Sequence, residues 1–352
     1  MSDVIVRLVG GVGHITLNRP AALNALTLGM VRRIYQALSE WEADTAVSFV
    51  FLDGSGERGF CAGGDIRLLY DAVLARRFDM PESFFREEYH LNQRVARFPK
   101  PVVALMDGVV MGGGIGLGGH ASHRVVTDRS VLAMPETRIG FLPDVGGTYL
   151  LGVAPGELGT HAALSAGRLD AADAIACGLA DRFVPSSQIS HLRDALLRAG
   201  SATAVSDSLD KYSIFPPQSR LALARGWIDP CYAHDEAEEI LAALQSASEP
   251  EAKQAAVEVA SASPTSVKVT LRALRTARRF GQLEPCLNQE FRLGLNLIRG
   301  PDFAEGVRAA VVDKDRNPKW HPARLEDVMP EEVERHFHLP PGSPELGLAP
   351  KE

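Results

Sequence analysis

The segment from Val102 to His120, VVALMDGVVMGGGIGLGGH, places seven glycines at and beyond the end of a short apolar strand. Glycine loses more backbone freedom on folding than any other residue, so a cluster of glycines lowers stability unless the backbone requires it. One requirement is a tight turn with close helix packing. The other is an approach of bare main-chain N–H groups to a bound molecule.

Nucleotide-binding patterns fit this cluster poorly. The chain has no G-x-x-x-x-G-K-[ST] stretch near it, which argues against a Walker-type phosphate loop. Gly114, Gly116 and Gly119 satisfy G-x-G-x-x-G, and Glu136, 20 residues after Gly116, is a candidate ribose ligand. However, the β-branched stretch HASHRVVTD follows at once and leaves no length for a full crossover helix. A dinucleotide site is therefore the alternative hypothesis from pattern alone.

A second glycine loop, FCAGGDI from Phe60 to Ile66, also follows a strand-like segment. An oxyanion hole needs two N–H donors aimed at a carbonyl oxygen that gains negative charge. Two glycine loops that each leave a strand are compatible with such a converging pair. An oxyanion hole for a carbonyl compound is therefore one hypothesis for these loops, beside a tight turn with close helix packing and a dinucleotide site.

Carboxylates for this chemistry occur in MPETRIGFLPDVGGTY, where Glu136 and Asp144 each follow a proline on one loop. Reactions at a carbonyl use a carboxylate as base or nucleophile, and commonly a second one for proton transfer. The structural alternatives are a helix cap for Asp144 and a solvated turn for Glu136. Glu87 and Glu88 in FFREEYHLN have an exposed helix surface as their default interpretation.

Other function classes are disfavoured by composition. The net charge of -7 argues against a nucleic-acid or membrane-surface partner, and no apolar run approaches the length of a bilayer span. His120 and His123 lack a third ligand in sequence, so we expect them to be structural and no metal to be bound. Four cysteines far apart, and an N-terminus without a signal-peptide pattern, lead us to expect a reduced, cytoplasmic protein.

The elements that must position these residues follow an α/β pattern. Strands are expected at Val4–Val9 and His14–Leu17, joined through GGVG as a hairpin and followed by a helix that Thr27 caps. Its predicted apolar face is formed by Met30, Val31, Ile34, Leu38 and Trp41. Strand–turn–helix units continue to about residue 185, and helical spacing dominates from residue 201. We therefore predict a core over 1–200, a helical region over 201–338 continuous with it, and a flexible tail over 339–352.

Three stretches, FCAGGDI, MGGGIGL and PETRIGFLPDVGG, resemble the signature loops of the crotonase (enoyl-CoA hydratase/isomerase) superfamily. Members of this superfamily bind acyl-CoA thioesters and stabilise an oxyanion with two backbone N–H groups. The resemblance implies a spiral of ββα units with a helical C-terminal region. It also implies that Gly64 and Gly113 supply the two donors.

The match is sharper to one branch of the superfamily, the 3-hydroxyisobutyryl-CoA hydrolases, and extends over residues 4–328. It rests on FFREEYHLN, FLPDVGG, SPTSVKVTLR and RGPDFAEGVRAAVVDKDRNPKWHP. The resemblance implies that Glu136 and Asp144 are the catalytic carboxylates and that Glu88 and Gly113 contact substrate. The first glutamate of a hydratase would fall at Gly116, so the two-carboxylate addition of water is in doubt.

The implied activity is hydrolysis of an acyl-CoA thioester, with 3-hydroxyisobutyryl-CoA of valine breakdown as substrate. Coenzyme A is then part of the substrate, and no other cofactor is implied. Superfamily members often assemble as trimers or pairs of trimers, which makes a homo-oligomer an expectation from resemblance. The alternatives are an enoyl-CoA hydratase or isomerase and a non-catalytic acyl-CoA-binding protein.

Overall fold

The computed structural model describes residues 2–350, and contacts within the chain group them into two compact units. One unit comprises the stretch up to Gly64, His90–Leu132 and Arg168–Arg220. The other comprises Asp65–Tyr89, Ala133–Gly167 and the stretch from Leu221 onward. Each unit consists of segments that are separate in the sequence, and neither unit has a boundary at residue 200. The division expected there, between a core and a helical region, stays a prediction.

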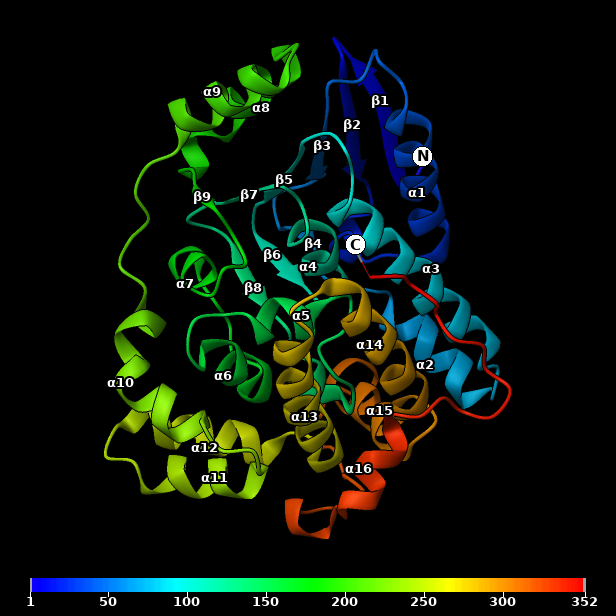
Figure 1. Ribbon diagram of the computed structural model, residues 1–352, viewed down its shortest axis with the longest axis vertical. Coiled ribbons are helices and arrows are strands. Elements are labelled where there is room, and N and C mark those ends of the chain that lie inside the picture. The colour runs from blue at the N-terminus through cyan, green and yellow to red at the C-terminus, as the bar shows by residue number, and fades with distance from the viewer. Residues whose placement is uncertain (1, 351–352) are drawn as a thin grey trace. The chain divides into compact units, whose positions relative to one another are not determined.

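The first unit is built on a six-stranded sheet whose strands, in spatial order, are β1 (Val4–Val9), β2 (Val12–Leu17), β3 (Phe49–Gly54), β5 (Val102–Met106), β7 (His123–Val126) and β9 (Arg182–Phe183). The predicted hairpin is present, because β1 and β2 pair antiparallel. The remaining neighbours pair parallel (Figure 1). The longer of these strands, β3 and β5, are almost entirely buried, as expected of a parallel sheet covered on both faces.

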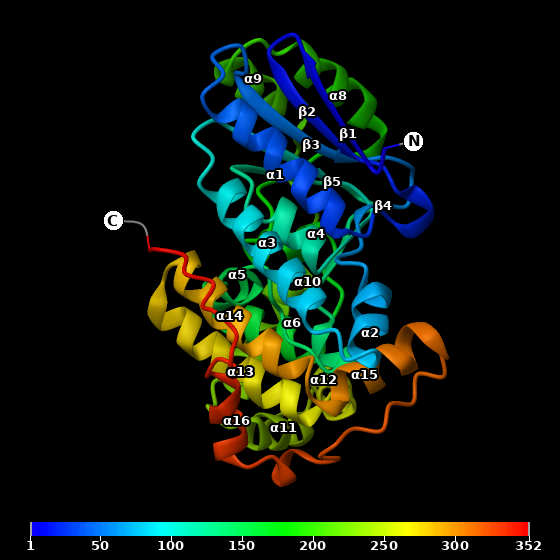
Figure 2. The same ribbon diagram turned by 90° about the vertical axis from the view of Figure 1, so that its right-hand side faces the viewer.

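The helices of this unit are α1 (Leu28–Glu42), α4 (Gly113–Gly118), α7 (Ala171–Ala176), α8 (Ile189–Arg198) and α9 (Ala202–Tyr212). Successive side chains of a strand point to opposite faces. Val12 packs in one cluster with Leu192 of α8, whereas a Cβ on Gly13 would lie 2.5 Å from the ring of Trp41 on α1. Helix α1 therefore covers one face of the sheet, and α8 and α9 cover the other (Figure 2).

Helix α1 forms as its sequence predicts. The Thr27 hydroxyl accepts a hydrogen bond from the Met30 amide at 3.3 Å, which caps the first turn. All five apolar positions expected to form its inner face are buried.

A small second sheet in the order β4-β6-β8 is formed by β4 (Gly59–Cys61), β6 (Val109–Met111) and β8 (Val131–Ala133). Strands β4 and β6 pair parallel. Because the carboxyl ends of parallel neighbours meet at one edge of a sheet, the segments that follow β4 and β6 leave that edge side by side. Those segments are the two glycine-rich stretches singled out from the sequence.

The second unit is mainly helical, as predicted for the later part of the chain. Its helices are α2 (Ile66–Leu74), the start of α3 (Asp79–Ala96), α5 (Gly147–Gly152), α6 (Leu158–Ser165), α10 (Arg220–Tyr232), α11 (Ala237–Ser246), α12 (Pro250–Ser261), α13 (Pro264–Phe280), α14 (Leu283–Leu297), α15 (Pro301–Val307) and α16 (Pro330–His336). Helix α13 is central, since it packs against α5, α6, α14 and α16. No helix among residues 2–350 has the length and apolar character needed to cross a membrane.

The C-terminal segment differs from the flexible tail expected from its prolines and glycines. It has no helix or strand from residue 339 to 350, but Leu346 and Leu348 are buried. The Asn288 side chain donates to the Leu348 carbonyl at 2.8 Å and accepts from its amide at 3.0 Å. Arg86 donates to two further carbonyl oxygens of the segment. Irregular backbone is therefore anchored here by specific side chains.

Candidate active site

The glycine loops, defined here as residues 61–64 and 111–114 of the first unit, touch backbone to backbone. Gly63 has a φ of +102°, and a Cβ on it would lie 3.1 Å from the Met111 carbonyl oxygen and 3.5 Å from the Gly113 amide nitrogen. A Cβ on Gly114 would lie only 2.3 Å from the Cys61 carbonyl oxygen. Glycine is therefore required for close approach, and the structure brings together the two loops that the sequence singled out.

Gly64 and Gly113 each lie in one of these loops. Gly113 is the first residue of α4, and N–H groups of a first helical turn have no acceptor within the helix. Gly64 forms a parallel bridge with Leu26, which fixes its backbone. The oxyanion role of the two amides stays a prediction. Because α4 has only six residues, it lacks the length of the crossover helix of a dinucleotide site.

The predicted carboxylates lie in the second unit and are buried. Glu88 on α3 is 2% exposed, while Glu136 and Asp144 are each 7% exposed. Glu136 begins the 3-10 helix η2 (Glu136–Ile139), and Asp144 lies on the turn before α5. Neither glutamate is on a solvated surface, so the structural alternatives considered for them do not apply. The acidic side chains have been buried despite the cost of desolvation.

Asp144 does not cap a helix. Helix α5 begins at Gly147 with Gly146 as its cap, and the Asp144 Oδ2 atom instead accepts a hydrogen bond from the Tyr89 hydroxyl at 2.7 Å. Burial raises the pKa of Asp144 to about 7, although the Tyr89 hydrogen bond opposes the shift. Asp144 is thus poised to exchange a proton near neutral pH.

Glu88 and Glu136 have pKa values well above the usual range of a carboxyl group. Burial is the largest cause for both, and the negative charge of Asp144 is the second. The Oε1 atom of Glu88 and the Oε2 atom of Glu136 are buried without a hydrogen-bond partner among residues 2–350. Buried polar atoms are nearly always satisfied in folded proteins, so these two oxygens mark positions for a ligand or water.

Two further glycines hold η2 in place. A Cβ on Gly140 would lie 2.3 Å from the carbonyl carbon of Asp302, and a Cβ on Gly306 would lie 2.4 Å from that of Ile139. The backbone of η2 therefore packs directly on the backbone of α15. This contact fixes the turn that carries Glu136.

Glu290 completes the acidic group and was not expected from the sequence. It lies on α14, is fully buried, and accepts hydrogen bonds from the Gly146 amide at 2.7 Å and the Thr148 amide at 2.9 Å. Burial raises its pKa to about 8, these bonds oppose the shift, and the charge of Asp144 adds to it. The sequence did contain an indication of its burial, because Glu290 lies on the apolar face of the helical pattern, between Leu287 and Phe291. We call Glu88, Glu136, Asp144 and Glu290 the carboxylate cluster.

The two histidines do not gather further ligands. Across residues 2–350, no group of three or more His, Cys, Asp or Glu side chains is arranged to hold a metal. Burial and the positive charge of Arg182 lower the pKa of His123, although the charge of Asp181 opposes them. The structural role expected for His120 and His123 stays a prediction.

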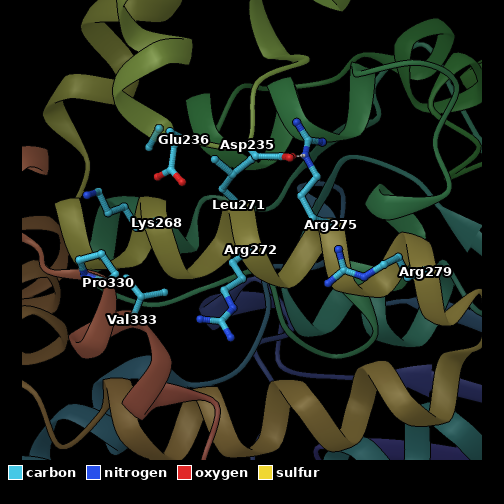
Figure 3. A pocket seen from close by; sticks show the side chains of 10 residues that line it. Asp235, Glu236, Lys268, Leu271, Arg272, Arg275, Arg279, Pro330 and Val333 are labelled. Atoms are coloured by element: carbon cyan, nitrogen blue, oxygen red, sulfur yellow. Dashed lines mark hydrogen bonds and ion pairs between the residues drawn. The ribbon is translucent and has the colours of Figure 1, made fainter.

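A separate cavity of about 320 Å³ lies in the second unit between α11, α13 and α16 (Figure 3). Its basic side chains are Lys268, Arg272, Arg275 and Arg279 of α13. Three of these cations already have acidic partners, because Lys268 pairs with Glu238, Arg272 with Glu334 and Arg275 with Asp235. None of the predicted site residues lines this cavity, and ion pairing reduces its attraction for an anionic ligand.

The chain belongs to the enoyl-CoA hydratase/isomerase family, whose family model matches residues 12–337. It is 39% identical to the mitochondrial 3-hydroxyisobutyryl-CoA hydrolase of Gallus gallus, over 99% of this chain and 91% of that protein. The resemblance to the hydrolase branch is thus confirmed.

Two solved structures share the fold closely. A carnitinyl-CoA dehydratase from Mycobacterium thermoresistibile is 46% identical with a TM-score of 0.94, over 99% of each chain. An enoyl-CoA hydratase from Rhodobacter sphaeroides is 41% identical with a TM-score of 0.92, over 99% of this chain and 100% of that one. The predicted α/β, crotonase-like fold with a helical C-terminal region is confirmed.

The expected cytoplasmic location is contradicted by the names of the relatives. The Gallus gallus hydrolase and other animal relatives are named as mitochondrial proteins. The four cysteines are indeed free and buried. Unpaired cysteines and an ordinary surface charge are compatible with any reducing compartment, however, and do not single out the cytosol.

Proposed function

We propose that this chain hydrolyses 3-hydroxyisobutyryl-CoA to 3-hydroxyisobutyrate and coenzyme A, a step of valine breakdown. Curated relatives with this activity in their names are 38–41% identical over 95–99% of the chain. The observation that carries the proposal is the buried trio Glu88, Glu136 and Asp144 in a chain whose residue 116 is glycine. Coenzyme A enters as part of the substrate, and the chemistry draws on no other cofactor.

In this mechanism, the amides of Gly64 and Gly113 donate to the thioester carbonyl oxygen. Negative charge develops on that oxygen when the carbonyl carbon becomes tetrahedral. Preorganised backbone donors stabilise this charge without reorganising, and one such donor typically contributes about 3–4 kcal/mol. The close contact of the glycine loops supports the proposal, since it holds the backbone rigidly.

Glu136 acts on the carbonyl carbon in one of two ways. As a nucleophile it forms a mixed anhydride and expels the coenzyme A thiolate, and water then hydrolyses the anhydride. As a base it removes a proton from the water that attacks directly. Both routes require the ionised form of Glu136, and in both the thiolate leaves and is protonated. Asp144 orients the substrate 3-hydroxyl or takes part in this proton transfer, and Glu88 contacts the substrate.

Hydration or dehydration of an acyl-CoA is the second candidate, because the two solved structures with TM-scores above 0.9 carry names of that class. Adding water across a double bond with two carboxylates needs a second acid at the position of Gly116, where no side chain exists. This absence favours hydrolysis.

The test is release of free thiol from a panel of acyl-CoAs, including 3-hydroxyisobutyryl-CoA, by the wild-type protein and by Glu136→Gln. We expect rapid release from the 3-hydroxy substrate and its loss in the variant. Loss of the enoyl thioester absorbance without thiol release would instead establish hydration. Binding of acyl-CoA with neither reaction would identify a binding protein. Incorporation of ¹⁸O from labelled water into Glu136 during a single turnover would assign the nucleophilic route.

A further inference from the structure

The turn from Asp144 to Thr148 adopts an unfavourable backbone conformation. Val145 has a φ of +53° and Gly146 a φ of +80°, so two successive residues are left-handed. Glycine adopts this conformation freely, but a β-branched residue such as valine does so only when its surroundings impose it. Something outside the turn must therefore hold it.

Glu290 supplies that support from α14. Its Oε2 atom accepts from the Gly146 amide at 2.7 Å, and its Oε1 atom accepts from the Thr148 amide at 2.9 Å and from the Thr148 hydroxyl. Both carboxylate oxygens are thus committed to the turn, and the side chain is fully buried. Such a carboxylate is not available to react with a substrate, and its hydrogen bonds instead hold the backbone of the turn in place.

Tyr89 constrains the Asp144 side chain itself. Its hydroxyl donates to Oδ2 at 2.7 Å, which leaves Oδ1 for other partners. The ring is fully buried between Phe85 and Phe291, whose centroids lie 6.0 and 6.3 Å away, so the hydroxyl has little freedom to move. Tyr89 directly follows Glu88 on α3, and Phe291 directly follows Glu290 on α14.

We propose that Glu290 and Tyr89 are positioning residues for Asp144, with Glu290 fixing the backbone of its turn and Tyr89 fixing the orientation of its carboxylate. The functional part of this inference rests on the proposed hydrolase activity, whereas the structural part does not. Both residues act through Asp144 and neither reacts with the substrate.

Three acidic side chains of the surrounding elements act on Tyr89 or Asp144, and they are Glu88 on α3, Glu136 on η2 and Glu290 on α14. All are acidic, and the Tyr89 hydroxyl makes the larger of the two hydrogen-bond contributions that lower the pKa of Asp144, the other coming from the backbone. Removing that hydroxyl raises this pKa. The activity that depends on ionised Asp144 then requires a higher pH.

The test compares Tyr89→Phe and Glu290→Gln with Glu157→Gln, a buried acid of the same unit whose partners are Arg275 and Arg278. In Glu290→Gln the new side chain places an amide donor against backbone donors, so one contact to the turn is lost while the volume is kept. We expect both positioning variants to lower kcat for thioester hydrolysis about 10- to 100-fold with KM changed less than about 3-fold. Tyr89→Phe should also move the acid limb of the kcat profile to higher pH. Glu157→Gln should leave kcat and the pH profile unchanged.

Hydrogen exchange of the Gly146 and Thr148 amides gives a readout that does not depend on turnover. It should quicken in Glu290→Gln and in the milder Thr148→Ala, and stay unchanged in Glu157→Gln. Unchanged exchange in Glu290→Gln would overturn the role of Glu290, and an unchanged kcat and pH profile in Tyr89→Phe would overturn the role of Tyr89. A wild-type protein without hydrolase activity would refute the proposed function while the exchange result still decides the role of Glu290. If Glu290→Gln does not fold, Thr148→Ala carries the exchange test of the turn, and Tyr89→Phe carries the kinetic test of the carboxylate orientation.

Discussion

The glycine loops and the carboxylate cluster are built in opposite ways. The loops place backbone groups, and they do so through strands β4 and β6 that pair directly and carry glycine where a Cβ would collide with a neighbouring carbonyl. The cluster places side chains that come from four separate segments, and its members are acidic groups that repel one another. The glycine loops depend on the absence of Cβ atoms at the positions where the two backbones meet. The carboxylate cluster depends on burial and on a few hydrogen bonds.

This difference decides how each region responds to change. A backbone donor survives most substitutions unless an added atom displaces the loop, whereas a carboxylate can be neutralised with little change of shape. The cluster is therefore expected to be the region more sensitive in catalysis. The loops are expected to be more sensitive in folding.

The largest effect is expected for Glu136→Gln, which keeps the shape and removes the ionisable group. We expect kcat for thiol release from 3-hydroxyisobutyryl-CoA to fall by about 10²- to 10⁴-fold, because base or nucleophilic function is lost. The melting temperature should not fall, since the Oε2 atom has no partner to lose. Activity within about 3-fold of wild type would remove Glu136 from the mechanism.

The cluster should also make stability depend on pH. A carboxyl whose pKa is raised on folding contributes stability that is present below its unfolded pKa and is lost as pH rises through the folded value. For Glu290 this window runs from about 4.5 to about 8. We expect the free energy of unfolding in urea to fall by a few kcal/mol between pH 5 and pH 8, since one pKa unit corresponds to about 1.4 kcal/mol. Glu290→Gln should flatten this fall.

Glu157 offers a control of opposite sign. Its burial raises the pKa, but hydrogen bonds from Arg278, Thr160 and Arg275 outweigh burial and lower it. Its stabilisation is therefore present above the unfolded pKa and lost as pH falls. Glu157→Gln should cost more stability at pH 8 than at pH 4. If Glu157→Gln and Glu290→Gln changed the pH dependence of the unfolding free energy in the same direction, the opposite signs assigned to the two residues would be contradicted.

The glycine loops are tested by Gly114→Ala. The new Cβ would lie 2.3 Å from the Cys61 carbonyl oxygen, so the backbone must shift. We expect a loss of about 1–3 kcal/mol in the free energy of unfolding, together with lower activity. Gly226→Ala is the matched control, because that glycine lies within α10 with nothing near its Cβ position. It should leave activity unchanged and stabilise the helix by up to about 1 kcal/mol.

The smallest effect is expected for Glu88→Gln. Glu88 is a predicted substrate contact that is not expected to react, so KM for 3-hydroxyisobutyryl-CoA should rise by about 10-fold or less while kcat changes little. Glu87→Gln, at the neighbouring and less buried position, should leave both constants unchanged. A larger fall in kcat than rise in KM would place Glu88 in the chemical step.

Much of the fold was predictable because its signals are local. The β1–β2 hairpin, the Thr27 cap and the two glycine loops each depend on a few consecutive residues with specific backbone demands. The sequence indicated Glu136 and Asp144 as candidate carboxylates, because each follows a proline on one loop. It did not indicate that they are buried.

Burial depends on contacts between distant segments, which a single sequence does not display. Glu88 had an exposed surface as its default interpretation, yet it is 2% exposed. Glu290 was overlooked because its partners Gly146 and Thr148 lie more than 140 residues earlier in the chain. The anchoring of Leu348 by Asn288 is likewise a contact at long range, 60 residues apart, and composition alone indicated flexibility.

The packing of η2 on α15 through Gly140 and Gly306 has a consequence for biosynthesis. Glu88 leaves the ribosome early, but the turn that carries Glu136 lacks the backbone it packs against until Asp302 and Gly306 have been translated. Glu290 is also translated late. We therefore expect the carboxylate cluster to be absent during most of translation. A nascent chain arrested before α15 should lack it even when its first strands have folded.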